Sequence, residues 1–116
     1  MNFMQISYKQ GDIIFVPYPY TDLTQTKKRP VIIISKNQIN KENYIVAKIT
    51  SVIRNDEFSF VLHEKDLDTK LNKPSEVRTN EIFTIHKTLV IKKFARLTKS
   101  VLKELTTKIQ DNISTE

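Results

Sequence analysis

Short apolar runs separated by polar connections dominate the first third of the chain, a pattern typical of strands. Residues 12–17 form one such run, which Gly11 precedes and a proline ends. A second run, residues 31–34, directly follows Pro30, and proline is tolerated at the first residue of a strand. Both runs therefore predict strands, joined by a polar connection that has no periodicity.

Residues 44–54 alternate between two kinds of side chain with a period of two. Because successive side chains of a strand point to opposite faces, one set should face the core and the other should be partly solvated. The partly solvated set places Thr50 on the same face as Lys48 and Arg54. The set predicted to face the core is Ile45, Ala47, Ile49, Ser51 and Ile53.

The pattern beyond residue 54 predicts a hairpin followed by shorter elements. Residues 55 and 56 are Asn and Asp, which tolerate left-handed backbone conformations and suit a hairpin tip. Alternating apolar residues over 58–62 predict the returning strand. The remaining expectations are a helical turn at 64–67, a short strand at 75–79, a turn at 80–84 and a strand near 89–92.

Apolar residues recur at helical spacing near the end of the chain and predict a helix over about 99–110, capped by Thr98. Lysines fall on the opposite face, so the apolar stripe should pack against the sheet. Residues 1–9 and 111–116 are expected to fray. The stripe consists of Val101, Leu102, Leu105 and Ile109.

Many short strands and one terminal helix predict a mainly β fold with a C-terminal helix, built as a small and strongly bent barrel. The 116 residues suit a single domain spanning 1–116. No segment approaches the roughly 18 apolar residues that span a bilayer, and the first ten residues lack the apolar stretch of a secretory signal. We therefore expect a cytoplasmic protein with no membrane partner.

Composition removes several classes of chemistry. Gly11 is the only glycine, whereas a phosphate-binding loop needs several glycines so that backbone N–H groups can reach the anion. The lack of cysteine removes disulfides, cysteine-ligated zinc and thiol nucleophiles. The acidic residues lack the spacing of metal ligands, so neither a metal nor a cofactor is expected. His63 and His86 could form an acid–base pair, but nothing in the sequence brings them together.

The net charge of +6 comes from 19 basic and 13 acidic residues and is concentrated in residues 23–54. The window holds seven basic residues and one acidic residue, Glu42, so its charge of +6 equals the net charge of the whole chain. Such a concentration indicates a site for a polyanion, most simply a nucleic acid. A solvated face is the alternative interpretation. The basic residues of the window are Lys27, Lys28, Arg29, Lys36, Lys41, Lys48 and Arg54.

Arg29 stands directly before Pro30 at the entry to a predicted strand, where a rigid backbone can aim its guanidinium at a phosphate. Thr50 offers a hydroxyl on a basic face, where it could orient the phosphate or relay a proton. The pair suits RNA cleavage, because the ribose 2′-OH is itself the nucleophile and the enzyme supplies positioning and a cation. The alternative interpretation is that Arg29 belongs to an ordinary basic loop and that Thr50 lies at the edge of the core, with no catalytic role for either.

Four segments, residues 11–35, 44–51, 73–78 and 81–85, resemble in the same order the MazF/PemK toxins of bacterial type II toxin–antitoxin systems. The resemblance implies an SH3-like small barrel with a terminal helix, the CcdB/PemK-like toxin fold, and a homodimer. It also implies an endoribonuclease, an mRNA interferase, that cuts single-stranded RNA at a short sequence without a metal. The products would be a 2′,3′-cyclic phosphate and a 5′-OH. A cognate antitoxin would block the RNA groove with an acidic, partly disordered segment.

The resemblance also implies which residues act. Catalysis would fall to Arg29 and Thr50, and the loop over residues 20–28 would border the RNA groove. The RNA-binding residues implied are Tyr20, Lys27, Lys28, Lys48, Ser51, Ser75 and Arg78.

The chain departs from the family pattern in lacking glycine near residues 25, 70 and 95. The first departure alters the loop beside the RNA and leaves the cleavage sequence open. Two other functions stay open at this point: a CcdB-like toxin that poisons DNA gyrase without cutting RNA, and a non-catalytic RNA-binding barrel. The Lys-Arg-Pro entry at residues 28–30 argues against the gyrase poison, which does not need an Arg–Thr pair.

Overall fold

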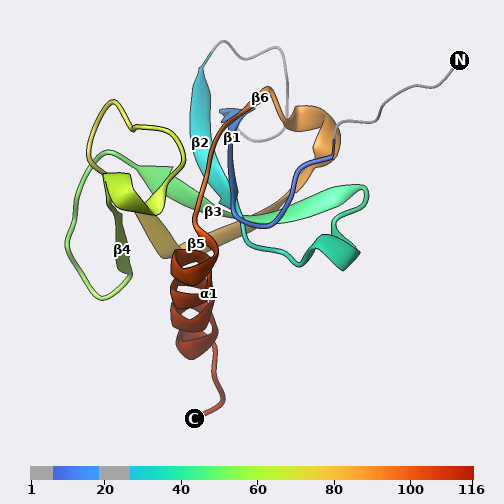
Figure 1. Ribbon diagram of the computed structural model, residues 1–116. Coiled ribbons are helices and arrows are strands. Elements are labelled where there is room, and N and C mark those ends of the chain that lie inside the picture. Colours follow the sequence, from blue (N-terminus) through green and yellow to red (C-terminus); the bar gives the residue numbers. More distant parts are fainter. Residues whose placement is uncertain (1–6, 19–26) are drawn as a thin grey trace, which may run out of the picture.

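A single curled antiparallel sheet with the strand order β4-β5-β3-β2-β1-β6 organises the chain, and one helix follows it (Figure 1). The computed structural model describes residues 7–18 and 27–116. This architecture confirms the predicted mainly β fold with a C-terminal helix. The strands are β1 (Asp12–Pro17), β2 (Lys28–Ile33), β3 (Asn43–Thr50), β4 (Ser59–Leu62), β5 (Ser75–His86) and β6 (Lys92–Arg96), and the helix is α1 (Lys99–Asn112).

The sheet buries side chains on both of its faces, in two separate apolar clusters. Because the sheet curls, the same strands contribute to both clusters, with neighbouring residues pointing to opposite sides. The helix-side cluster includes Ile13, Ile32, Ala47, Ile49, Val77, Leu105 and Ile109. The opposite cluster is Ile14, Val16, Val31, Ile33, Tyr44, Val46 and Ile85.

The two clusters explain why the prediction for β3 was partly wrong. Tyr44 and Val46, assigned to a solvated face, are buried, whereas Ile45 is 37% exposed. Alternation identifies two faces but does not say which of them is covered when both are apolar. Residues 51–54 also leave the sheet, because β3 ends at Thr50.

The predicted hairpin between 44–54 and 58–62 is wrong, because β4 pairs with β5 and not with β3. The left-handed conformation expected at its tip is nevertheless present, since Asn55 has φ +51°. The predicted turn at 80–84 is also wrong, because β5 runs without interruption through that segment. It pairs with β3 along both halves, with an irregular register between Ala47 and Ile49, and its first half also pairs with β4 on the other edge.

Pro30 was predicted to stand at the start of a strand. The structure instead has it as the third residue of β2. On one side it lies opposite Phe15 of β1. Pairing with β3, on the other side, begins only at Val31. The missing N–H of proline therefore falls where one edge of β2 is still unpaired.

Helix α1 packs as predicted, with Leu105 and Ile109 buried, and it runs two residues past its expected end. Thr98 precedes it, but its side chain makes no capping hydrogen bond. Asn112 donates from Nδ2 to Thr79 Oγ1 at 3.0 Å, which ties the last turn to β5. At the other end of the chain, the backbone N–H of Tyr8 donates to the Tyr44 hydroxyl at 3.2 Å. Ordered contacts thus reach into the segments expected to fray.

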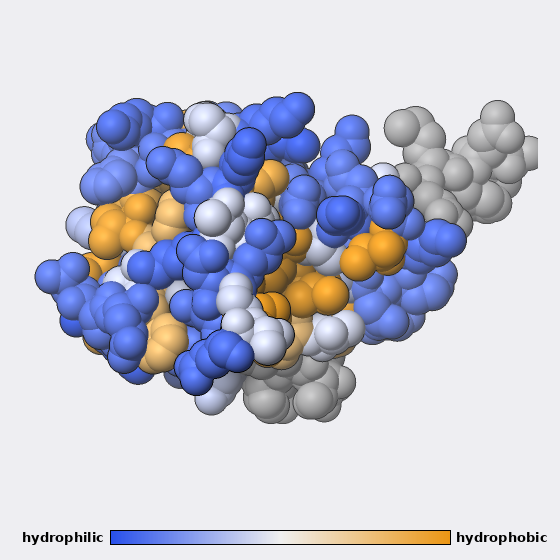
Figure 2. Space-filling model, turned by 90° about the horizontal axis from the view of Figure 1, so that it is seen from below, coloured by the Kyte–Doolittle hydropathy of each residue, from blue (hydrophilic) through white to orange (hydrophobic). Residues whose placement is uncertain are grey.

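Gly11 adopts φ +92° where the chain enters β1, a conformation that favours glycine. A Cβ atom here would lie 3.1 Å from Leu102 Cδ2, so the glycine also lets the helix approach the sheet closely. Seen from the end of the helix, the surface is mostly hydrophilic, with apolar side chains in separate patches (Figure 2). No helix in the described ranges is long and apolar enough to cross a bilayer.

Candidate functional site

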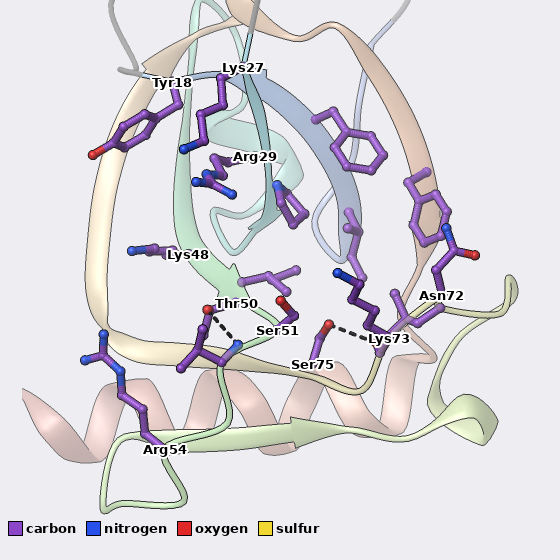
Figure 3. Close-up of a pocket in the computed structure, with 17 residues that line it drawn as sticks. Tyr18, Lys27, Arg29, Lys48, Thr50, Ser51, Arg54, Asn72, Lys73 and Ser75 are labelled. Atoms are coloured by element: carbon purple, nitrogen blue, oxygen red, sulfur yellow. Dashed lines mark hydrogen bonds between the residues drawn. The ribbon is translucent and has the colours of Figure 1, made fainter.

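A cavity of about 570 Å³ opens between β2, β3 and the segments that follow β3 and precede β5 (Figure 3). Its deeper wall is apolar, including Ile13, Phe15, Ile49 and Phe94, and its rim is polar. The polar residues that line it are Tyr18, Lys27, Arg29, Lys48, Thr50, Ser51, Arg54, Asn72, Lys73 and Ser75.

Among the described residues, all the charged side chains that line the cavity are basic: Lys27, Arg29, Lys48, Arg54 and Lys73. Because these cations converge on a partly apolar wall, the local potential favours an anionic ligand over water. The charge concentration predicted from residues 23–54 therefore contributes four of the five cations. Lys73 comes from a distant part of the sequence.

The end of the β2–β3 pairing brings the two candidate catalytic residues to one cavity. The pairing ends with Val31 opposite Lys48, and Arg29 and Thr50 lie two residues beyond that pair, one on each strand. Both side chains line the cavity, as does Lys48. Figure 3 shows all three on the wall of the same cavity.

Arg29 presents its guanidinium to the cavity without an acidic partner among the described residues. Its Cζ atom lies 5.6 Å from the centroid of the Tyr18 ring, and Lys27 Nζ lies 5.8 Å from the same ring. A guanidinium held against an aromatic face keeps its in-plane N–H donors free for an anion. Arg29 is thus suited to bind a phosphate in the cavity.

The Thr50 hydroxyl has a fixed role as an acceptor, because the backbone N–H of Val52 donates to its Oγ1 at 3.1 Å. The hydroxyl proton is left to donate, which suits contact with an anionic oxygen. Ser75 is arranged in the opposite sense, since its Oγ donates to the Lys73 carbonyl at 3.1 Å and keeps its lone pairs to accept.

Of the other residues implied to bind RNA, Lys27, Lys48, Ser51 and Ser75 line the cavity with Arg29 and Thr50. Lys28 does not line it, and instead places Nζ 5.1 Å from the centroid of the Phe15 ring. Tyr20 lies outside the described residues.

The assignment of Arg78 to RNA contact is wrong. Its side chain is only 3% exposed and forms ion pairs with Glu76, at 2.6 Å, and Asp56, at 2.9 Å. Its Nε also lies 3.3 Å from Glu81 Oε2. The Arg78 hydrogen bonds hold the pKa of Asp56 at about 2, and the bonds from Asp56 and Glu76 raise the pKa of Arg78. Because Arg78 is buried and paired with carboxylates, it is not available to contact RNA.

Sequence reasoning missed four polar residues of the cavity: Tyr18, Arg54, Asn72 and Lys73. Arg54 had been placed on the face of Thr50, and Lys73 opens one of the four family-like segments. Tyr18 directly follows Pro17, the last residue of β1. For Asn72 alone, no sequence pattern pointed to the cavity.

The two histidines lie apart. His86 ends β5, where its Nδ1 lies 2.8 Å from Thr88 Oγ1. His63 follows Leu62, which pairs with Ser75 at the other end of the same strand. Neither lines the cavity, so the acid–base pair considered from the sequence does not form.

The sequence matches the family model of PemK-like, MazF-like toxins of type II toxin–antitoxin systems over residues 9–113. The match covers most of the chain, and the protein belongs to this family. No curated protein sequence shows significant similarity to it.

Solved structures share the fold at low sequence identity. MazF from Deinococcus radiodurans is 16% identical with a TM-score of 0.74, covering 96% of this chain and 100% of its own. The toxin MazF-mt6 of Mycobacterium tuberculosis is 21% identical with a TM-score of 0.71, covering 90% and 98%. An endoribonuclease from mycobacterial species, solved with its cognate antitoxin, is 15% identical with a TM-score of 0.74, covering 95% and 100%. These likenesses confirm the predicted toxin fold.

Proposed function

We propose that this protein is an endoribonuclease toxin that cleaves single-stranded mRNA at a short sequence, and that the cavity between β2 and β3 is its active site. The observation that carries the proposal is the cavity itself, which joins Arg29 and Thr50 with charged residues that, in the part of the chain the structure describes, are all basic. Family membership supports the same function. A gyrase poison does not need this arginine–threonine pair beside a basic cavity.

The reaction needs no nucleophile from the protein. The 2′-oxygen of the ribose loses its proton and forms a bond to phosphorus, while the bond from phosphorus to the 5′-oxygen breaks and that oxygen gains a proton. The products are a 2′,3′-cyclic phosphate and a 5′-OH. Negative charge develops on the phosphoryl oxygens, and a preorganised cation that meets them lowers the barrier. The step is metal-independent, because this charge is met by side chains.

Arg29 is the candidate for that cation. Its donors face the cavity, and a bidentate contact with two phosphoryl oxygens would stabilise the transition state more than the ground state. It would also assist protonation of the leaving 5′-oxygen. Thr50 would donate its hydroxyl proton to the phosphate and orient it for in-line attack.

The remaining residues would hold the RNA strand. Lys27, Lys48 and Lys73 would contact flanking phosphates, and the Phe15 wall of the cavity offers an aromatic face for a base. Ser51 and Ser75 would add hydrogen bonds.

We propose further that the protein acts in the cytoplasm as a homodimer and is neutralised by a cognate antitoxin. An acidic antitoxin segment would compete with RNA for the same cations. Support comes from related folds solved with antitoxins, including the MazE–MazF complex of Deinococcus radiodurans, 14% identical over 97% of this chain with a TM-score of 0.76.

Cleavage of single-stranded RNA in EDTA tests the proposal. The wild-type protein should cut at a few defined positions, and Thr50→Val should reduce the rate by about 10- to 100-fold, because it removes the donor but keeps the shape. Thr50→Ser is the matched control and should retain most activity. Binding of intact RNA without any cut would indicate the RNA-binding barrel, and neither binding nor cutting would contradict the proposal.

A further inference from the structure

A buried carboxylate stands next to the active-site threonine. Glu76 is fully buried and lies opposite Thr50 in the pairing of β3 with β5. Its Oε1 accepts hydrogen bonds from the backbone N–H groups of Arg54, at 3.0 Å, and Asn55, at 3.4 Å. These donors belong to the turn that follows β3. One oxygen of Glu76 therefore fixes the backbone of that turn.

The other oxygen of Glu76 is held by partners that also reach the turn. Oε2 accepts from Ser59 Oγ at 2.7 Å and from Arg78 Nη1 at 2.6 Å. Arg78 in turn donates to both oxygens of Asp56, at 2.9 and 3.0 Å. Burial raises the pKa of Glu76, but the hydrogen bonds from Ser59, Arg78 and the backbone N–H groups of Arg54 and Asn55 together outweigh it and leave the pKa below its usual value. The pair thus stays charged near neutral pH.

The turn over residues 51–56 needs such an anchor. Val52 and Ile53 are exposed, so apolar burial does not hold the turn in place. Asn55 sits at φ +51°, a conformation that costs energy unless the surroundings enforce it. Polar contacts to Glu76 and Arg78 supply that enforcement.

The same turn builds one wall of the cavity. Ser51, Val52 and Arg54 line it, and the N–H of Val52 orients the Thr50 hydroxyl. A second link runs through Glu81, which contacts Arg78 and lies 3.6 Å from Lys48.

We propose that Glu76 is a positioning residue for the cleavage reaction, which holds the 51–56 turn so that Thr50 and Arg54 meet the RNA correctly, while Arg78 supplies the cation that its buried carboxylate needs. The inference rests on the proposed function of the cavity. Glu76 does not line the cavity. It acts by fixing the turn, and a displacement of about 1 Å in an active site can reduce a rate by about 10²-fold.

Two double variants separate positioning from stability. E76M/R78M replaces the buried ion pair with apolar side chains of similar size, a change that is often neutral for stability. E76Q/R78M also lacks the ion pair, but Gln can still accept the N–H groups of Arg54 and Asn55 through its Oε1. The two variants differ only in whether position 76 holds the turn.

Single-turnover cleavage should fall by about 10²-fold in E76M/R78M and return to within about fivefold of the wild type in E76Q/R78M. The dissociation constant for RNA should change by less than about threefold in both, since the other cations of the cavity remain. Equal rates in the two variants, whether both high or both low, would overturn the proposal.

Amide hydrogen exchange gives a readout that does not depend on cleavage or on any variant. In the wild-type protein, the amide protons of Arg54 and Asn55 should exchange at least about tenfold more slowly than that of Ile53. Equal exchange at the three amides would overturn the positioning role. Slow exchange in a protein that cuts no RNA would instead contradict the proposed function while leaving the anchored turn intact.

Discussion

Two arginines of this protein occupy opposite environments. Arg78 is 3% exposed and lies within ion-pair distance of three carboxylates, those of Asp56, Glu76 and Glu81. Arg29 lines the cavity against the Tyr18 ring, with no acidic partner among the residues described.

The difference decides what each residue can do. The donors of Arg78 are already used, so it can hold a turn but cannot bind a ligand. Arg29 keeps its donors for an anion that arrives from outside, and a planar fork of this kind matches two phosphoryl oxygens. Counting basic residues in the sequence cannot separate the two roles, because the separation depends on where the carboxylates fold.

The largest expected effect is on stability, at the buried arginine. Arg78→Met leaves Glu76 buried without its cation, and breaking a buried pair from one side typically costs about 3–5 kcal/mol. Urea unfolding at pH 7 measures the loss. Arg29→Met is the matched control and should change the unfolding free energy by less than about 0.5 kcal/mol. Similar losses of unfolding free energy in the two variants would contradict the contrast between the buried and the cavity-lining arginine.

The second effect is on activity, at the half-buried arginine that lines the cavity, Arg29. Arg29→Met should lower the rate of RNA cleavage by about 10²- to 10³-fold, the range for removing one preorganised donor to a developing oxyanion. Circular dichroism should show an unchanged fold. A rate within threefold of the wild type would remove Arg29 from the catalytic role.

The third effect is a loss of stability in acid. Asp56 and Glu76 have pKa values below their usual 3.8 and 4.5 in the folded protein, so the stabilisation from each is complete above its usual value and is lost as the pH falls through its folded pKa, which for Asp56 is about 2. The unfolding free energy of the wild type should therefore fall between pH 5 and pH 2. E76Q/R78M should show a shallower fall over the same window, and a parallel curve would contradict this assignment.

The smallest effect is expected at the outer edge of the network. Glu81 is 37% exposed, and its contacts with Lys48 and Arg78 are long. Glu81→Gln should change the unfolding free energy by less than about 1 kcal/mol, as expected for exposed pairs. A loss as large as that of Arg78→Met would show that the buried pair with Glu76 is not the main anchor.

The elements that a local pattern specifies were predictable from the sequence. The apolar run of β1 and the helical spacing of Leu105 and Ile109 each depend on neighbours within one element. The pairing of β4 with β5 was not predictable, because two polar residues at 55–56 suit a hairpin tip as well as the turn that is present.

Prediction of the site divides in the same way. Arg29 and Thr50 were predicted from the Arg-Pro entry and the family-like segments, and both line the cavity where the pairing of β2 with β3 ends. Arg78 was misassigned because one partner, Asp56, lies 22 positions away, and the pairing of β4 with β5 that brings it close is not revealed by the sequence. Its other partner, Glu76, lies two positions away on the same strand. Lys73 was overlooked because the pre-β5 segment reaches the cavity only in the folded chain.

The masses of the RNA fragments test the central claim most directly. Single-stranded RNA is incubated with the wild-type protein in EDTA, and the fragments are weighed by mass spectrometry, with Arg29→Met as the matched control. We expect upstream fragments that end in a 2′,3′-cyclic phosphate, one water lighter than a linear phosphate, and no such fragments with the variant. Uncut RNA, fragments that carry a 5′-phosphate, or equal cleavage by the variant would contradict the account.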